Sequence, residues 1–239
     1  MKKTIKAVVV GYGNRGQVYA DYSLDCPDEL KITAIVDPNE FKLKEAKERY
    51  GLKEDELFKS FDDFLKAKID CDIVINSTMD ELHYKVAMQI LENGYDMLIE
   101  KPIVPDKKEL FDIKKLAEKI GAKVFVCHVL RYTPFYKTIK EILLSGEIGE
   151  IMTMEMNEHV CRQHYLASYD RGKWNSEEKC GSSFLLAKCC HDLDIMCWLN
   201  NLSSPSEVVS LGGRYEFVKE RMPKDASEFC YECKYERTC

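Results

Sequence analysis

The sequence predicts an α/β fold in which a doubly wound parallel sheet is followed by an α+β domain. Short apolar runs alternate with segments of helical spacing through residue 126, which is typical of βαβ units. After that point the regular alternation stops, and helical segments mix with half-buried strand patterns. We therefore expect one domain over residues 1–126 and a partial α+β domain over residues 127–239.

The strands expected in the first domain are short apolar runs, as strands buried on both faces of a parallel sheet should be. They cover Lys6–Val10, Lys31–Val36, Asp72–Asn76, Asp96–Ile99 and Lys123–Val126. Helices are expected between them, at Gln17–Ser23, Glu40–Tyr50, Leu82–Asn93 and Lys107–Ile120. The last three are followed directly by a glycine, which is a common signal for the end of a helix.

The second domain is expected to contain few strands. Helical spacing predicts helices at Tyr136–Leu144 and Ser183–Leu199, and alternation predicts strands at Glu150–Glu158 and Glu207–Gly212. Two strands are marginal without further partners. We therefore expect the second sheet to have an exposed edge or apolar face.

Composition excludes several classes of protein. The chain has 239 residues, with 35 Lys and Arg against 41 Asp and Glu, and this acidic balance argues against a nucleic-acid-binding protein. No segment approaches the roughly 18–20 apolar residues of a membrane span. The first apolar run ends in a glycine-rich turn rather than a cleavage site, so no export signal is indicated. We expect a cytoplasmic protein whose 11 cysteines are thiols or metal ligands.

A glycine-rich turn follows the first expected strand. Its residues are Gly11, Tyr12, Gly13, Asn14, Arg15 and Gly16, a GxGxxG pattern between a strand and a helix. In that context the glycines let a dinucleotide pyrophosphate approach the start of a helix, as in the Rossmann fold. Asp37 ends the second strand, where a carboxylate can bind both ribose hydroxyls and repel a 2′-phosphate. These features favour NAD, although a nearby Arg or Lys would let NADP bind.

Two further groups of residues are candidates for a catalytic role. Glu100, Lys101 and Pro102 follow the fourth strand, at the sheet edge where ligands bind in open α/β sheets. A lysine there can hold a substrate hydroxyl and stabilise developing negative charge. On the later helix, Lys188, Asp192 and Asp194 lie close in sequence to His191. Such neighbours can tune the pKa of a histidine, so His191 is a candidate general base.

Several segments occur together in an order that resembles one known family. They are the GYGNRG turn, STMDELH at Ser77–His83, EKP at Glu100–Pro102, RYTPFY at Arg131–Tyr136 and HDLDIMCWL at His191–Leu199. In this combination they resemble the Gfo/Idh/MocA oxidoreductases, which include glucose–fructose oxidoreductase and inositol dehydrogenases. The resemblance covers about Lys6 to Leu202.

The resemblance implies a tightly held NAD(P) and hydride transfer at a hydroxyl-bearing carbon of a sugar or cyclitol. It also implies that the second domain carries an open, mostly antiparallel sheet, which needs a longer chain than this one and through which a homo-oligomer forms. We therefore expect the chain to be a shortened form of a longer protein, with an incomplete second domain. Lys101 matches the catalytic lysine of the family and His191 its catalytic histidine. Family members usually carry an aspartate four residues before that histidine, where this chain has Ala187, followed by Lys188. This departure puts the usual Asp-assisted proton relay in question.

The remaining expected contacts divide between cofactor and substrate. Cofactor contacts are expected from Ser77, Thr78, His83, Glu100 and Lys101, besides the glycine turn and Asp37. Substrate contacts are expected from Arg131, Tyr132, Trp174, Lys188 and Asp192.

Alternatives remain for the activity and for the tail. An NAD-dependent glycosidase would oxidise its substrate only transiently, without net NADH. A dinucleotide-binding sensor would have no chemical need for Lys101 or His191. In the tail, Cys230, Cys233 and Cys239 have a spacing that suits zinc, but a fourth ligand is missing, and ordinary reduced thiols explain the pattern equally well.

Overall fold

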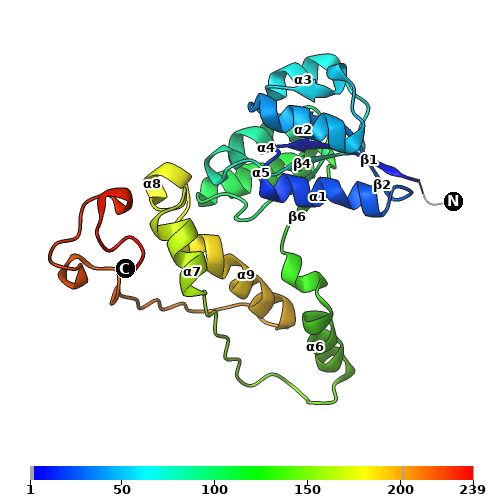
Figure 1. Cartoon of the computed structure of the whole chain (residues 1–239). Helices are drawn as coiled ribbons and strands as arrows, with labels where there is room; N and C mark the ends of the chain where they lie inside the picture. The colour runs from blue at the N-terminus through cyan, green and yellow to red at the C-terminus, as the bar shows by residue number, and fades with distance from the viewer. Residues whose placement is uncertain (1–2, 201, 239) are drawn as a thin grey trace. The chain divides into compact units, whose positions relative to one another are not determined.

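A parallel sheet with helices on both faces forms the first part of the molecule (Figure 1). The computed structural model of the chain describes residues 3–200 and 202–238. These residues fall into two compact units, Met1–Asn201 and Leu202–Cys239, which are described separately. Within the described residues, six parallel strands form one sheet in the order β3-β2-β1-β4-β5-β6. This is the strand order of a dinucleotide-binding Rossmann fold, with its switch point between β1 and β4.

The strands and helices of this part alternate along the chain. The strands are β1 (Ile5–Val10), β2 (Leu30–Val36), β3 (Leu57–Phe58), β4 (Ile73–Asn76), β5 (Asp96–Ile99) and β6 (Val124–Val126). The helices are α1 (Asn14–Asp25), α2 (Glu40–Tyr50), α3 (Phe61–Ala67), α4 (His83–Glu92) and α5 (Lys107–Ile120). A short 3₁₀ helix, η2 (Asp80–Leu82), precedes α4.

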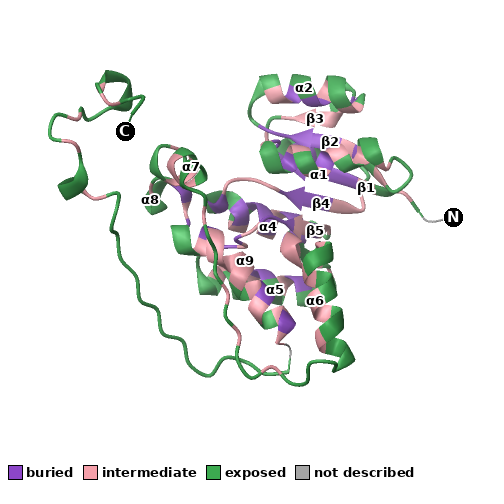
Figure 2. Cartoon of the chain, turned by 60° about the horizontal axis from the view of Figure 1, so that its bottom comes forward, coloured by how far each residue is buried: buried purple, intermediate pink, exposed green. Residues whose placement is uncertain are grey.

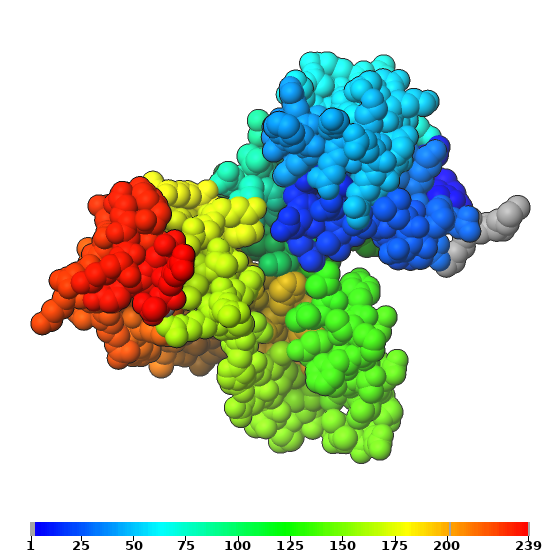
Figure 3. Space-filling view, in the orientation of Figure 1, coloured from blue at the N-terminus to red at the C-terminus, as the bar shows by residue number. Residues whose placement is uncertain are grey.

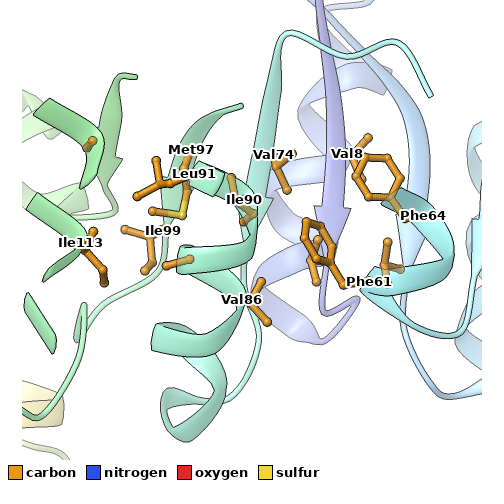
Figure 4. Packing of buried hydrophobic residues seen from close by; sticks show 14 of the residues in the cluster. Val8, Phe61, Phe64, Val74, Val86, Ile90, Leu91, Met97, Ile99 and Ile113 are labelled. Atoms are coloured by element: carbon orange, nitrogen blue, oxygen red, sulfur yellow. The ribbon is translucent and has the colours of Figure 1, made fainter. Parts of the chain in front are cut away.

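Alternate residues of each strand supply two cores, one on each face of the sheet. Val8 and Val10 of β1 join the larger core, to which α3, α4 and α5 contribute Phe64, Ile90 and Ile113 (Figure 4). The neighbouring residues of β1 face the other way, against α1 and α2. Burial on both faces explains why these strands are continuous apolar runs rather than alternating ones. The strands accordingly form the most buried layer of this region (Figure 2).

Local capping explains where the helices begin and end. Asp106 precedes α5, and its carboxylate accepts hydrogen bonds from the backbone N–H groups of Lys108 and Glu109. Gly51 and Gly121 end α2 and α5 in the left-handed conformation that glycine adopts without strain. The bounds expected for α2 and α5 are therefore confirmed.

The α/β class and the five expected strands of the first domain are confirmed, but the sequence analysis missed β3 and α3. β3 has only two residues, Leu57 and Phe58, so it has no pattern of its own. It exists because Leu57 and Phe58 pair with Ile35 and Val36 of β2. α3 is held by its buried residues Phe61 and Phe64.

Between β6 and Asn200 the regular structure is helical. A 3₁₀ helix, η3 (Val129–Tyr132), leads into α6 (Pro134–Ser145), whose first turn is capped by Thr133. The later helices are α7 (Arg162–Tyr165), α8 (Glu177–Cys180) and α9 (Phe184–Leu199), with a π-helical turn at Leu166–Asp170. The space-filling view shows α6 and the residues after it as green and yellow-green atoms at the surface (Figure 3).

The prediction of two strands in the second domain is wrong. Glu150–Glu158 and Glu207–Gly212 are both irregular, and neither is paired with a strand among the described residues. Sequence alternation is compatible with a strand, but a strand is stable only when a neighbour accepts and donates its backbone hydrogen bonds. The described part of the chain therefore contains no antiparallel sheet.

The second unit has little regular structure. It contains two 3₁₀ turns, η5 (Lys219–Arg221) and η6 (Cys230–Glu232), within its described residues. An ion pair between Lys234 and Asp225, 2.7 Å long, links parts of the segment. Of the helices in the described ranges, none has the length and apolar character needed to cross a membrane.

Substitution of Phe64 tests the packing of the larger core. Its side chain is 0% exposed and packs against Phe58, Phe61 and Tyr95. Phe64→Ala should therefore lower the free energy of unfolding by about 3–5 kcal/mol. The matched control is Phe41→Ala, because Phe41 is 86% exposed and its removal should change stability by less than about 0.5 kcal/mol. Equal effects in urea unfolding would contradict this description of the core.

Candidate functional site

The candidate site lies along the carboxyl edge of the parallel sheet. The strands are in register there: Val10 pairs with Val36 and with Asn76, and Asn76 pairs with Ile99. Ile99 in turn pairs with Val126. The residues that follow these strands therefore meet at one edge, although they come from five separate parts of the sequence. This edge is where open α/β sheets bind ligands.

The glycine turn fits between β1 and α1 with no space for two side chains. Gly11 has φ +87°, and a Cβ on it would lie 2.7 Å from the Ser77 carbonyl oxygen. A Cβ on Gly16 would lie 2.2 Å from the Gly11 carbonyl oxygen. At Gly13, by contrast, an added Cβ would meet nothing within 4 Å. Gly13 precedes Asn14 at the start of α1, where no side chain caps the first backbone N–H groups of the helix.

Asp37 organises the turn from a buried position at the sheet edge. It is 5% exposed, and its Oδ2 accepts a hydrogen bond from the Tyr12 backbone N–H at 2.9 Å. Its Oδ1 accepts another from the Asn39 N–H at 2.9 Å. The Lys42 ammonium lies 3.4 Å from Oδ2. The carboxylate therefore holds the glycine turn against the end of β2, while Lys42 places a positive charge beside it.

A buried polar network shapes the loop after β4. The side chain of Asn76 donates to the His83 carbonyl oxygen at 3.1 Å and accepts from the Thr78 hydroxyl at 2.8 Å. His83 is 0% exposed, with Nδ1 2.8 Å from the Pro102 carbonyl oxygen and Nε2 3.2 Å from that of Thr78. His83 therefore links the loop after β4 to the loop after β5. The Ser77 hydroxyl donates to the Gly11 carbonyl oxygen at 2.8 Å and so connects the loop after β4 to the glycine turn.

Glu100 is a buried carboxylate with a full set of donors. Arg15 Nε donates to it at 2.8 Å, the Tyr19 hydroxyl donates to the same oxygen, and the Lys101 backbone N–H donates to the other at 2.8 Å. Burial acts to raise the pKa of Glu100, but these hydrogen bonds outweigh it and the pKa is lowered. Glu100 is therefore an anion that holds Arg15 in place and orients the start of the Lys101–Pro102 loop.

The structure brings Lys101 and His191 together. Lys101 Nζ donates to the Ala187 carbonyl oxygen of α9 at 3.0 Å, and His191 lies one helical turn after Ala187. His191 Nδ1 is buried without a hydrogen-bond partner among the described residues, as is His128 Nδ1. The two imidazole rings are 5.9 Å apart, edge to face. Burial, the charge of Lys101 and that of His128 lower the pKa of His191 to about 4.

A second set of contacts fixes the start of α9 against the loop after β4. The Ser182 hydroxyl donates to Asp80 Oδ2, and both residues are buried. A Cβ on Gly181, which has φ +80°, would lie 3.0 Å from the Glu81 backbone. Ser183 then caps α9 by accepting the N–H of Leu186. The helix that carries His191 is therefore attached to the sheet edge at its beginning and again at Ala187.

Of the residues expected to bind substrate, Lys188 and Trp174 lie beside an aromatic cluster. Lys188 Nζ is 2.8 Å from His164 Nε2 and 5.6 Å from the centre of the Tyr169 ring. The Trp174 ring lies 6.4 Å from that of Tyr169, and Phe184 lies 4.7 Å from it. The three rings and Lys188 thus come together from α9 and from the segment between α7 and α8.

The other three expected substrate residues are placed differently. Arg131 forms an ion pair with Asp194, with Nε 2.7 Å from Oδ2, and so ties η3 to α9. Tyr132 is 68% exposed. Asp192 lines a groove of about 280 Å³ with residues of α6 and the irregular segment, including Tyr136 and Met156. Its Oδ2 is buried without a hydrogen-bond partner in the described ranges.

The tail cysteines do not form a complete site within the residues described. Cys230 is an exposed free thiol and Cys233 a half-buried one. Cys239 lies outside the described residues. In the parts of the chain that the structure describes, no three His, Cys, Asp or Glu side chains are grouped so that they could hold a metal ion.

Sequence reasoning missed four residues that shape this edge: Asn76, Asp80, His128 and Ser182. Asn76 and His128 had a usable signal, since each is a polar residue at or just after the carboxyl end of a predicted strand. Asp80 and Ser182 had none, because their hydrogen bond joins positions 102 residues apart.

Family models match most of the chain. Residues 5–128 match a model described as "Oxidoreductase family, NAD-binding Rossmann fold". Residues 136–228 match a model described as "GFO/IDH/MocA C-terminal domain".

The individual curated proteins that match are distant relatives, and they are longer than this chain. An inositol 2-dehydrogenase of Leifsonia xyli subsp. xyli (strain CTCB07) is 25% identical over 223 residues, which are 92% of this chain and 60% of the relative. The scyllo-inositol 2-dehydrogenase (NADP(+)) IolW of Bacillus subtilis (strain 168) is 25% identical over 191 residues, 80% of this chain and 50% of that protein. This chain spans from 42 to 60% of the length of such curated relatives.

Solved structures share the fold. The WlbA dehydrogenase of Chromobacterium violaceum, in complex with NADH and UDP-GlcNAcA, is 25% identical with a TM-score of 0.67. The match covers 83% of this chain and 56% of that one.

The pKa of His191 can be measured directly. NMR titration of the histidine ring protons, with His191→Asn identifying the signal, should give a pKa of about 4 in the folded protein. In urea the same group should titrate near its ordinary value of about 6.5. Because the folded state then binds fewer protons between these values, the contribution of His191 to stability is lost as the pH falls from about 6.5 to about 4. A folded-state pKa near 6.5 would contradict the described environment.

Proposed function

Because the chain belongs to the GFO/IDH/MocA oxidoreductase family, we propose that it is an NAD(P)-dependent dehydrogenase acting on a hydroxyl-bearing carbon of a sugar or cyclitol. The observation that supports this most strongly is the proximity of Lys101 and His191 at the carboxyl edge of the sheet. A sensor would need the glycine turn but neither of these groups. The curated relatives named inositol dehydrogenases support the same class of substrate.

The glycine turn and Asp37 form the proposed cofactor site. The open space at Gly13 and the uncapped start of α1 fit a pyrophosphate. Asp37 suits the two hydroxyls of an NAD ribose and repels a 2′-phosphate, whereas Lys42 offsets part of that repulsion. We therefore propose NAD as the cofactor, with NADP also able to bind. Glu100, Thr78 and His83 would hold the surrounding loops.

In the proposed reaction, the substrate hydroxyl lies between Lys101 and His191. Lys101 donates a hydrogen bond to the hydroxyl oxygen and stabilises the negative charge that develops on it. His191 is neutral above its lowered pKa, so its imidazole can accept the hydroxyl proton. The bound nicotinamide would supply the acceptor for the hydride. The products are then a carbonyl compound, the reduced cofactor and one proton on His191.

The same proposal assigns roles to the two parts of the chain. Residues 1–126 would bind the cofactor, and residues 127–239 would contribute substrate contacts and a surface for homo-oligomer formation. Loss of the usual aspartate at Ala187 leaves His191 without a carboxylate partner on the preceding turn. Lys101 contacts the same residue through its hydrogen bond to the Ala187 carbonyl oxygen.

Two variants test the catalytic assignment. Lys101→Met and His191→Asn should each lower kcat by about 10²–10⁴-fold, which is the usual contribution of a general acid or base. His191→Asn should bind NAD⁺ within about twofold of the unmodified chain, and Lys101→Met should keep most of its NAD⁺ affinity, because neither group is needed to hold the pyrophosphate. Lys115→Met, at an exposed position on α5, is the matched control. NADH absorbance on a panel of inositols and sugars measures turnover, and full turnover in both variants would overturn the assignment.

A pair of glycine variants tests the cofactor site. Gly13→Ala should fold normally, since its Cβ meets nothing, yet weaken NAD⁺ binding by about tenfold or more because the methyl group occupies the pyrophosphate approach. Gly16→Ala should instead lower the free energy of unfolding by about 1–3 kcal/mol through its clash with Gly11. Calorimetry and thermal unfolding distinguish the two effects. Unchanged NAD⁺ affinity in Gly13→Ala would place the cofactor elsewhere.

A further inference from the structure

Two lysine ammonium groups lie beside the proposed reaction centre without an acidic partner. Lys101 donates to the Ala187 carbonyl oxygen, and the next residue of α9, Lys188, contacts His164 and the Tyr169 ring. Both lysines are half-buried. Within residues 3–200 and 202–238, no Asp or Glu oxygen lies within 4.0 Å of either ammonium. Two such like charges are unfavourable unless an anion joins them.

The nearby carboxylates that the structure describes form no ion pair with either lysine; Asp192, one helical turn after Lys188, instead lines the groove beside α6. Glu100 is held by Arg15 and Tyr19, and Asp194 is paired with Arg131. The charge of Glu158 does reach Lys188, but Glu158 is exposed on the irregular segment and forms no ion pair with it. Burial and the positive charge of Lys101 together lower the pKa of Lys188, which shows that its surroundings disfavour an unpaired cation.

The neighbourhood of Lys188 also suits a sugar ring. Tyr169 lies next to Lys188 and packs against Trp174 and Phe184, so the surface of an aromatic ring adjoins the ammonium. Aromatic rings present such a surface to the C–H face of a sugar. An ammonium has three donors, and Lys188 uses one of them on His164. The remaining donors are available to an anionic substituent of a sugar held against these rings.

From these placements we infer that the substrate is an anionic sugar, whose carboxylate or phosphate is bound by Lys188 while its reacting hydroxyl meets Lys101 and His191. The inference rests on the proposed function, since it specifies the substrate class of the same site. Lys188 is then a specificity residue: it selects the charge of the substrate and takes no part in proton or hydride transfer.

Calorimetry on the chain saturated with NAD⁺ tests this inference without depending on turnover. The ligands are matched pairs: D-glucuronate with D-glucose, D-galacturonate with D-galactose, and D-glucose 6-phosphate with D-glucose. At least one anionic member should bind about tenfold or more tightly than its neutral partner, as expected for a hydrogen bond to a charged group. The preference should shrink as salt is added, because ions screen a partly exposed pair. The uronates and the phosphate distinguish the two possible anions.

Variants of Lys188 complete the experiment. Lys188→Met should abolish the preference for the anion and leave NAD⁺ affinity unchanged, whereas Lys188→Arg should retain part of the preference. Lys179→Met, at an exposed lysine on α8, is the control and should behave like the unmodified chain. The inference is overturned if no anionic sugar binds more tightly than its neutral partner, or if Lys188→Met keeps the preference. Failure to bind NAD⁺ in the first titration would instead overturn the proposed function.

Discussion

The register of the parallel strands is the constraint on which the site depends. β1, β2, β4, β5 and β6 end side by side, so the residue after each strand is delivered to one edge. A shift of one residue in any strand would turn its buried side chains to the opposite face. The two cores on the faces of the sheet prevent such a shift. Packing of ordinary apolar residues therefore determines the position of Asp37 relative to Glu100.

The second requirement is the attachment of α9 to this edge. The hydrogen bond from Ser182 to Asp80 and the close contact of Gly181 with Glu81 hold the start of the helix. Because α9 is a continuous helix, fixing its start also fixes the positions of Ala187 and His191. The result is a half-buried histidine close to positive charges, and both the burial and these charges lower its pKa. The charges that lower the pKa of His191 come from Lys101, after β5, and from His128, after β6, although His191 itself lies on α9.

The sequence was sufficient for features that depend on local pattern, and insufficient for those that depend on distant partners. Apolar runs and terminal glycines identified the strands and most helices, and the GxGxxG spacing identified the turn. The missed strand β3 is formed by pairing alone, and the strand expected at Glu150–Glu158 lacks such a partner. Similarly, Arg131 was expected to face substrate, but the structure pairs it with Asp194, 63 positions away. No local pattern encodes that pairing.

Lys101 is hydrogen-bonded before any substrate arrives. Its ammonium donates one of its three N–H groups to the Ala187 carbonyl oxygen, which orients it and leaves two donors for a substrate hydroxyl. A hydrogen bond to a neutral hydroxyl contributes little net free energy, because it replaces a hydrogen bond to water. The bond strengthens when the oxygen gains negative charge as its proton leaves, since charge-assisted hydrogen bonds are stronger. In the proposed reaction, Lys101 therefore discriminates between the ground state and the transition state, and affects turnover more than substrate affinity.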